Sequence, residues 1–290
     1  MSTRPEFIPP MLPTLVDEPP EGDDWIHELK FDGYRTQIVI ADRRARLFTR
    51  NGHDWTLKYL PLAEAAERIQ VGSGAVIDGE VIVAEAEGKP NTKALKPAIR
   101  TAPKRLIYIA FDLLHLDGYD FRDQPLQRRR LLLHAMLKPE HEPIRFSQSF
   151  EGTSTEIFDA IERMGLDGMV SKRLGSRYRS GRTIDWMKTT CFVEAEFGII
   201  GVQREGRESA MALMADETGN YVGSAFVTLP KGIRERLWQR VQAKAGAKPP
   251  KGLDKEKAEW IRPGLIGRVR FLKGEETLRH ATLKDVREDQ

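Results

Sequence analysis

The sequence predicts an α+β protein of two domains, in which antiparallel sheets are followed by a small β-barrel. Its 290 residues exceed the usual size of one domain and bury a core without disulfides. Predicted strands come in pairs rather than alternating singly with helices, which argues against a doubly wound Rossmann fold. After Cys191 the pattern changes to short, regularly spaced strands. The predicted domains are therefore residues 1–191 and 192–290.

The elements of the first domain follow from its apolar periodicity. Residues 1–24 are rich in proline, which predicts an extended tail rather than a helix. Alternating or β-branched runs, bounded by turn residues, predict strands at residues 34–41, 44–49, 75–84 and 106–114. Helical spacing predicts helices at residues 60–69, 127–137 and 154–164. Capping by Thr153 or Ser154 and termination at Gly165 support the last of these helices.

The second domain is predicted to contain five short strands and one helix. The strands are expected at residues 197–203, 210–215, 221–229, 265–272 and 276–282. The helix is expected at residues 231–245, and residues 246–259 read as an exposed loop rich in Lys, Pro and Gly. Five strands and a helix are typical of an OB-fold, a barrel that commonly binds nucleic acid.

Composition narrows the class of protein. A single cysteine excludes an intramolecular disulfide framework, and no apolar run reaches the roughly 20 residues that cross a bilayer. The N-terminus lacks signal-peptide features, so we expect a cytoplasmic protein of the bacterial nucleoid with no membrane partner. The net charge is only +3, but residues 231–290 carry 16 lysines and arginines against nine aspartates and glutamates. Such a basic segment suits a phosphate backbone.

The usual phosphate-loop, dinucleotide and zinc-protease motifs are absent from the sequence. A different hexapeptide, Lys30-Phe31-Asp32-Gly33-Tyr34-Arg35, lies directly before a predicted strand. Alone it is equally consistent with an Asp-Gly hairpin turn whose charges are solvated.

Further motifs follow this hexapeptide in a fixed order along the chain. They are Thr49-Arg50-Asn51-Gly52, Asp78-Gly79-Glu80, Phe111-Asp112, Asp167-Gly168-Met169-Val170-Ser171-Lys172 and Trp186-Met187-Lys188. A last motif ends the chain and contains Arg279, Lys284, Arg287 and Asp289. The whole set, over residues 25–290, resembles the ordered motifs of ATP-dependent DNA ligases in the covalent nucleotidyltransferase superfamily. The similarity is greatest to the ligase module of bacterial ligase D.

The resemblance implies an ATP-grasp-like adenylation domain followed by an OB-fold that swings about a hinge near Cys191. It also implies three steps: lysine adenylation by ATP, AMP transfer to a DNA 5′-phosphate, and attack by the 3′-hydroxyl. Lys30 is then the nucleophile. A free lysine is neutral in only roughly one molecule in 2,500 at pH 7, so cationic neighbours, a metal or desolvation must lower its pKa.

The resemblance assigns roles to other residues. AMP, carried covalently on Lys30, is expected to contact Glu28, Asp32, Arg35, Arg50, Glu80, Phe111, Lys172 and Lys188. Glu80 would accept hydrogen bonds from the ribose hydroxyls, Phe111 would stack on adenine and Arg50 would bind the DNA 5′-phosphate. Glu80 and Asp167 would hold Mg²⁺ or Mn²⁺. DNA phosphates are expected at Arg50, Arg177, Arg179 and Arg182, without sequence specificity.

Three positions depart from the family pattern. Asp167 stands where the family usually has Glu, while Thr190 and the C-terminal Gln290 stand where it usually has Lys. A catalytically weakened protein that binds DNA ends therefore remains an alternative, as does an RNA ligase or capping-type nucleotidyltransferase, which shares the lysine motif. The expected partners are nicked or broken duplex DNA and an end-joining protein such as Ku, with the chain itself a monomer.

Overall fold

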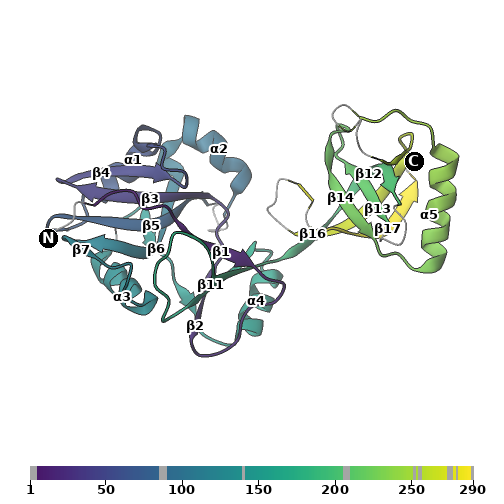
Figure 1. Ribbon diagram of the computed structural model, residues 1–290. Helices are drawn as coiled ribbons and strands as arrows, with labels where there is room; N and C mark the ends of the chain where they lie inside the picture. The colour runs from purple at the N-terminus through teal and green to yellow at the C-terminus, as the bar shows by residue number, and fades with distance from the viewer. Residues whose placement is uncertain are drawn as a thin grey trace. The chain divides into compact units, whose positions relative to one another are not determined.

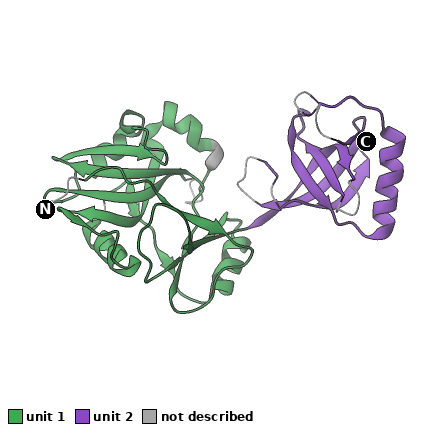
Figure 2. Cartoon of the chain, viewed as in Figure 1, with its two compact units in different colours: residues 1–190 green, residues 191–290 purple. Residues whose placement is uncertain are grey.

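The computed structural model divides the chain into two units, residues 1–190 and 191–290 (Figure 2). Cys191, which the sequence assigned to the first domain, is the first residue of the second unit and is buried. The structure describes residues 5–84, 90–138, 141–204, 210–250, 253, 257–272, 277–278 and 280–288. In this described part of the chain, no helix has the length and apolarity needed to cross a membrane.

The first unit contains two sheets (Figure 1). One sheet has the strand order β1 (Met11–Leu15), β11 (Gly181–Thr190), β10 (Gly168–Arg173), β2 (Trp25–Leu29) and β9 (Ser149–Phe150). The other has the order β4 (Arg44–Thr49), β3 (Tyr34–Ala41), β5 (Gly74–Val83), β6 (Leu106–Leu116) and β7 (Tyr119–Asp120), with β8 (Ile144–Phe146) beside β6. Most pairs are antiparallel, so the predicted α+β class is confirmed.

Helices pack on these sheets. They are η1 (Thr56–Tyr59), α1 (Leu60–Ala66), α2 (Thr92–Thr101), η2 (Pro103–Arg105), α3 (Leu126–Met136) and α4 (Ser154–Arg163). Thr153 caps α4, and the structure adds a reciprocal contact that makes a capping box: the Glu156 N–H donates to the Thr153 hydroxyl, and the Thr153 N–H donates to the Glu156 carboxylate. Helix α2 was not predicted, because Pro97 lies inside it and proline normally ends a helix.

The two sheets meet through a small apolar core. It contains Met11, Val39, Val76, Phe111, Leu114, Leu126, Tyr178 and Trp186. A larger core covers the other face of the β3–β5–β6 sheet, where α1, α2 and α3 pack. Residues 5–24, the described part of the predicted tail, contain no helix, as predicted, but they are also part of the fold. Strand β1 lies parallel to β11, and Met11 is fully buried.

The second unit is a closed barrel. Strands β13 (Met211–Ala215), β14 (Tyr221–Val227), β17 (Thr282–Glu288), β16 (Leu265–Leu272) and β12 (Phe192–Gln203) follow one another, and β12 pairs again with β13. The short β15 (Glu259–Trp260) adds to β12, and α5 (Lys231–Lys244) lies between β14 and β16 in the chain. This is the five-stranded barrel expected of an OB-fold.

One strand of the barrel differs from its prediction. The last strand was expected at residues 276–282, of which 276 and 279 lie outside the described residues, whereas β17 runs from Thr282 to Glu288. Only Leu283 of β17 is buried, so the strand lacks the clean apolar alternation that sequence reading depends on.

Candidate active site

Lys30 lies at one end of a row of side chains that crosses three strands. It directly follows β2, and its backbone N–H donates to the Gly168 carbonyl of β10 at 2.9 Å. Gly168 is in register with Thr190 of β11. Because no side chain stands on Gly168, nothing on β10 separates Lys30 from Thr190 in this row.

Two further rows lie beside the first on the same face. Glu28 is in register with Val170 and Val170 with Lys188, while Lys172 is in register with Trp186. Side chains alternate between the faces of a strand, so Glu28, Lys30, Lys172 and Lys188 share one face of the sheet. This is the face that meets Phe111 of the opposite sheet. The structure thus brings together four residues that the sequence separates by up to 160 positions.

The opposite sheet supplies Arg35, Asp78 and Glu80. Arg35 and Glu80 are in register on β3 and β5. The turn between Lys30 and Arg35 passes close over β5, because a Cβ atom added to Gly33 would lie 2.2 Å from the Val81 carbonyl oxygen. Only glycine therefore allows this approach, which gives the Asp32-Gly33 pair a structural reason as well as a chemical one.

Arg35 is held by a buried carboxylate. Its Nε and Nη2 atoms each donate to Asp78 at 2.8 Å, and Nη2 also donates to the Met11 carbonyl at 3.1 Å. The Tyr178 hydroxyl donates to the same carboxylate at 2.5 Å. Burial acts to lower the pKa of Arg35, but the Asp78 carboxylate outweighs it and the pKa is raised. Arg35 therefore remains charged and rigidly placed.

Glu80 is a half-buried carboxylate close to several charges. Burial raises its pKa to about 7, an effect that the nearby Arg35 and Lys30 partly offset and that Asp78 and Asp32 reinforce. Lys30 itself is 14% exposed at its side chain, and its Nζ lies 4.0 Å from Asp32 Oδ1. The predicted nucleophile is therefore accessible to solvent and lies near two carboxylates, those of Asp32 and Glu80.

Lys172 is almost completely buried and paired. Its Nζ lies 2.9 Å from Glu28 Oε1, and it stands 4.2 Å from the ring centroid of Phe111 and 4.5 Å from that of Trp186. Burial lowers the pKa of Lys172 to about 8, with Glu28 opposing and Arg130 reinforcing the change. A lysine in this state loses its charge at a pH that an enzyme assay reaches.

Phe111 is in contact with protein groups around its ring. It is 7% exposed, packs edge to face on Trp186, and lies 4.5 Å from the Arg35 guanidinium carbon. The sequence left open a core role for this ring, and the packing shows that it has one. Stacking on adenine stays a prediction.

The motif around β11 has one unusual feature. Thr190 is 3% exposed, and its hydroxyl has no hydrogen-bond partner among the described residues. Lys188 is half-buried on β11, and Asp167 is half-buried directly before β10.

No cluster of three or more His, Cys, Asp or Glu side chains suited to a metal occurs among the described residues. Mg²⁺ does not need one, because it is commonly held by one or two carboxylates together with substrate phosphates.

The residues predicted to contact DNA are all exposed: Arg50, Arg177, Arg179 and Arg182. Arg50 lies in the turn after β4. Arg179 pairs with Asp123 at 2.5 Å, and Arg182 donates to the Pro13 carbonyl at 3.1 Å. These contacts are at the surface, where water competes with them.

The terminal motif is partly described. Lys284 and Arg287 are exposed on β17, and Arg287 donates to both carboxylate oxygens of Glu196 on β12, at 3.1 and 2.7 Å. Arg279, Asp289 and Gln290 lie outside the described residues.

Sequence reasoning missed Arg130, Ser147 and Tyr178, which contact the site from other elements. Arg130 donates to Glu28 at 2.8 Å, and the Ser147 hydroxyl donates to the same carboxylate at 2.5 Å. Their separation from Glu28 by more than 100 residues leaves no local pattern to find them.

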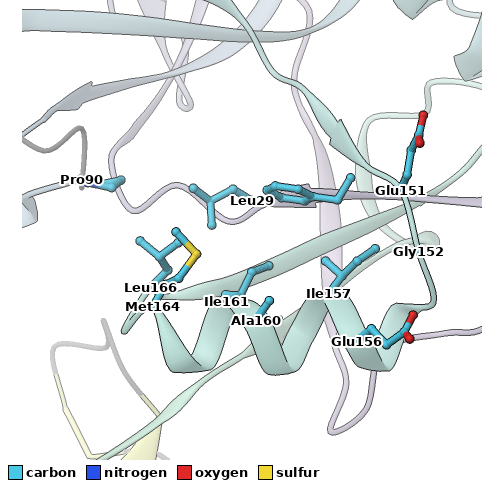
Figure 3. Close-up of a pocket in the computed structure, with 11 residues that line it drawn as sticks. Leu29, Pro90, Glu151, Gly152, Glu156, Ile157, Ala160, Ile161, Met164 and Leu166 are labelled. Atoms are coloured by element: carbon cyan, nitrogen blue, oxygen red, sulfur yellow. The ribbon is translucent and has the colours of Figure 1, made fainter.

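A separate apolar pocket of about 500 Å³ lies against α4 (Figure 3). Ile157, Ala160 and Ile161 of α4 line it together with Leu29 and the exposed Phe150. Leu29 alternates with Glu28 and Lys30 along the chain, so this pocket is on the other face of β2 and contains none of the predicted site residues.

Comparisons with known proteins agree with this geometry. Residues 10–189 match the family model of the ATP-dependent DNA ligase domain. The chain is 36% identical to the multifunctional non-homologous end joining protein LigD of Pseudomonas aeruginosa, over 99% of this chain and 36% of LigD. It is 31% identical to a probable DNA ligase of Beutenbergia cavernae, over 76% of this chain and 46% of that protein. The chain thus spans about a third of the LigD relative.

Solved structures extend the match over both units. The ligase domain of Mycobacterium tuberculosis LigD superimposes with a TM-score of 0.62 at 25% identity, covering 97% of this chain and 95% of that one. A mycobacterial DNA ligase D complexed with ATP and MES gives a TM-score of 0.60 at 26% identity, with the same coverage. The chain belongs to the ATP-dependent DNA ligase family.

Proposed function

We propose that this chain seals nicks or breaks in duplex DNA with ATP, through a covalent AMP on Lys30. The observation that carries the proposal is the shared sheet face of Lys30, Lys172 and Lys188, with Glu80 opposite. A nucleophile, two cations and a carboxylate are the groups that nucleotidyl transfer to a lysine requires.

In the first step the neutral Lys30 amine attacks the α-phosphorus of ATP. The bond between that phosphorus and the bridging oxygen breaks, pyrophosphate leaves, and the amine loses a proton. Lys172 and Lys188 would stabilise the negative charge that develops on the α-phosphate oxygens. Glu80 and Asp167 are the side chains that would hold Mg²⁺ or Mn²⁺ together with phosphate oxygens, and the ion would add further positive charge there.

The later steps need DNA. The 5′-phosphate of a nick attacks the phosphorus of AMP and releases Lys30, and the adjoining 3′-hydroxyl then attacks the activated 5′-phosphate and releases AMP. Arg50 is the residue assigned to that 5′-phosphate. Exposed guanidinium groups bind phosphates without reading bases, so the binding should be independent of sequence and weakened by salt.

The biological setting is proposed from the relatives. The LigD relatives are described as non-homologous end joining proteins, which supports a role in repair of broken DNA ends. We propose that the chain acts as a monomer, in the bacterial nucleoid, with an end-joining protein such as Ku presenting the DNA.

Sealing of defined nicks tests the proposal. A duplex with one labelled nick is incubated with the protein, Mg²⁺ and either ATP or GTP, and a second duplex carries the nick in RNA. We expect sealing of the DNA nick with ATP only. Sealing of RNA alone, or a preference for GTP, would assign the chain to the RNA ligases or capping enzymes, and binding without sealing would assign it to the end-binding proteins.

A further inference from the structure

Arg130 reaches from helix α3 to the floor of the proposed active site. Its Nη1 atom donates to Glu28 Oε1 at 2.8 Å, and its Nη2 atom donates to the Ser147 carbonyl at 2.8 Å. The guanidinium carbon lies 4.6 Å from the ring centroid of Phe146. Arg130 is 7% exposed, so these contacts rather than water stabilise its charge.

Two cations share one carboxylate oxygen at this point. Glu28 Oε1 pairs with Arg130 and also with Lys172, while the Ser147 hydroxyl donates to Oε2. Asp112 on β6 also acts on Lys172, and Asp112 is paired with the buried Arg129. Arg35 on β3 lies against the same Phe111 ring as Lys172, and its charge is paired with Asp78. Glu28, Arg130 and Lys172 together therefore carry a net charge of +1.

The location of this surplus charge matters. Arg130 extends from α3 to the Ser147 carbonyl, whereas Lys172 lies over the ring of Phe111 on the face that carries Lys30. Without Arg130, Glu28 would neutralise Lys172 alone, and no net positive charge would remain on this part of the face. Charges buried in a low-dielectric site interact strongly, so loss of this net positive charge would weaken the attraction for a bound phosphate.

We infer that Arg130 is a positioning residue for adenylation: it takes up the charge of Glu28 and so leaves Lys172 free to act as a cation toward the nucleotide phosphates. This inference rests on the proposed function, because it concerns the rate at which Lys30 receives AMP. Among the described residues, Arg130 contacts Glu28, the carbonyls of Ser147 and Phe111 and the ring of Phe146, and not Lys30.

The test is the rate of adenylation in single turnover, measured with α-labelled ATP over a range of ATP concentrations and pH values. Arg130→Gln should slow the step at saturating ATP by about tenfold or more. In that variant the Glu28 carboxylate offsets the whole charge of the protonated Lys172, which then stabilises the developing phosphate charge less. Arg130→Lys, which keeps the charge, should recover most of the rate. Arg128→Gln, an exposed change on the same helix, is the matched control and should leave the rate unchanged.

The pH profile separates this role from simple support of the fold. At low ATP the rate constant reports the free protein, where the pKa of Lys172 is about 8. Loss of the repulsion from Arg130 raises that pKa, so the alkaline limb of the Arg130→Gln profile should move to higher pH. Ser147→Ala removes a competing donor to Glu28 without changing any charge, and it should move the limb in the same direction by a smaller amount.

If Arg130→Gln is folded and adenylates at the wild-type rate, or if Arg130→Lys is as slow as Arg130→Gln, the inference is wrong. If Arg130→Gln does not fold, an unmoved alkaline limb in Ser147→Ala contradicts it instead. Failure of the wild-type protein to take up any label would overturn the proposed function itself, which is a distinguishable result.

Discussion

Replacing Asp78 with alanine should strongly destabilise the first unit, because it leaves the Arg35 charge buried without a partner. Asp78 is fully buried and accepts two hydrogen bonds from Arg35 at 2.8 Å and one from Tyr178 at 2.5 Å. Removing one partner of such a buried pair costs about 3 to 5 kcal/mol. For a unit of this size that corresponds to a fall in Tm of about 6 to 20 °C.

Thermal unfolding followed by calorimetry measures this effect. The matched control is Asp123→Ala, which breaks the ion pair with Arg179 at the surface, where both side chains are more than half exposed. Surface pairs contribute at most about 1 kcal/mol, so the control should lower Tm by only a few degrees. If Asp78→Ala lowers Tm no more than Asp123→Ala does, the buried network does not anchor Arg35 and the reasoning is refuted.

Four further predictions concern catalysis and pH. Lys30→Ala should abolish labelling by α-labelled ATP while leaving DNA affinity in a filter-binding assay unchanged; continued nick sealing would show that another residue is the nucleophile. Arg50→Ala should retain labelling but slow sealing of a nicked duplex by about 100-fold, since one phosphate contact is lost. Thr190→Lys should raise the adenylation rate by roughly tenfold by restoring a positive charge to the site; no gain would mean that another cation already acts there. Because the pKa of Glu80 is raised to about 7, ionising it opposes folding, so wild-type stability in denaturant should fall as pH rises from about 4.5 to 7, and Glu80→Gln should flatten that fall.

The main strands and helices were predictable because their apolar residues follow the period of the element. The runs around β3, β4, β5 and β6 alternate or are β-branched, and each is bounded by turn residues. Strand β2 was not predicted, since most of its residues are buried on both faces and include His27 and Glu28. Strand β1 contains Pro13, and its pairing with β11 joins residues about 170 positions apart.

The candidate site was likewise only partly predictable from the sequence. The motif residues Lys30, Glu80, Lys172 and Lys188 were identified from sequence, and the fold brings them to facing surfaces of two sheets. What the sequence could not give is how their charges are balanced. The partner of Arg35 is Asp78, and the partners of Glu28 come from α3 and from the segment after β8. Such partnerships depend on three-dimensional packing and leave no local spacing.

The most direct test of the proposed function is to identify the residue that receives AMP. The protein is first treated with pyrophosphate to remove any bound AMP, then incubated with ATP and Mg²⁺, digested, and mapped by mass spectrometry. We predict one adenylyl group on the peptide that contains Lys30, which is lost again when nicked duplex DNA is added. An adduct on Lys172 or Lys188, or no adduct at all, would contradict the assignment of Lys30 as the nucleophile.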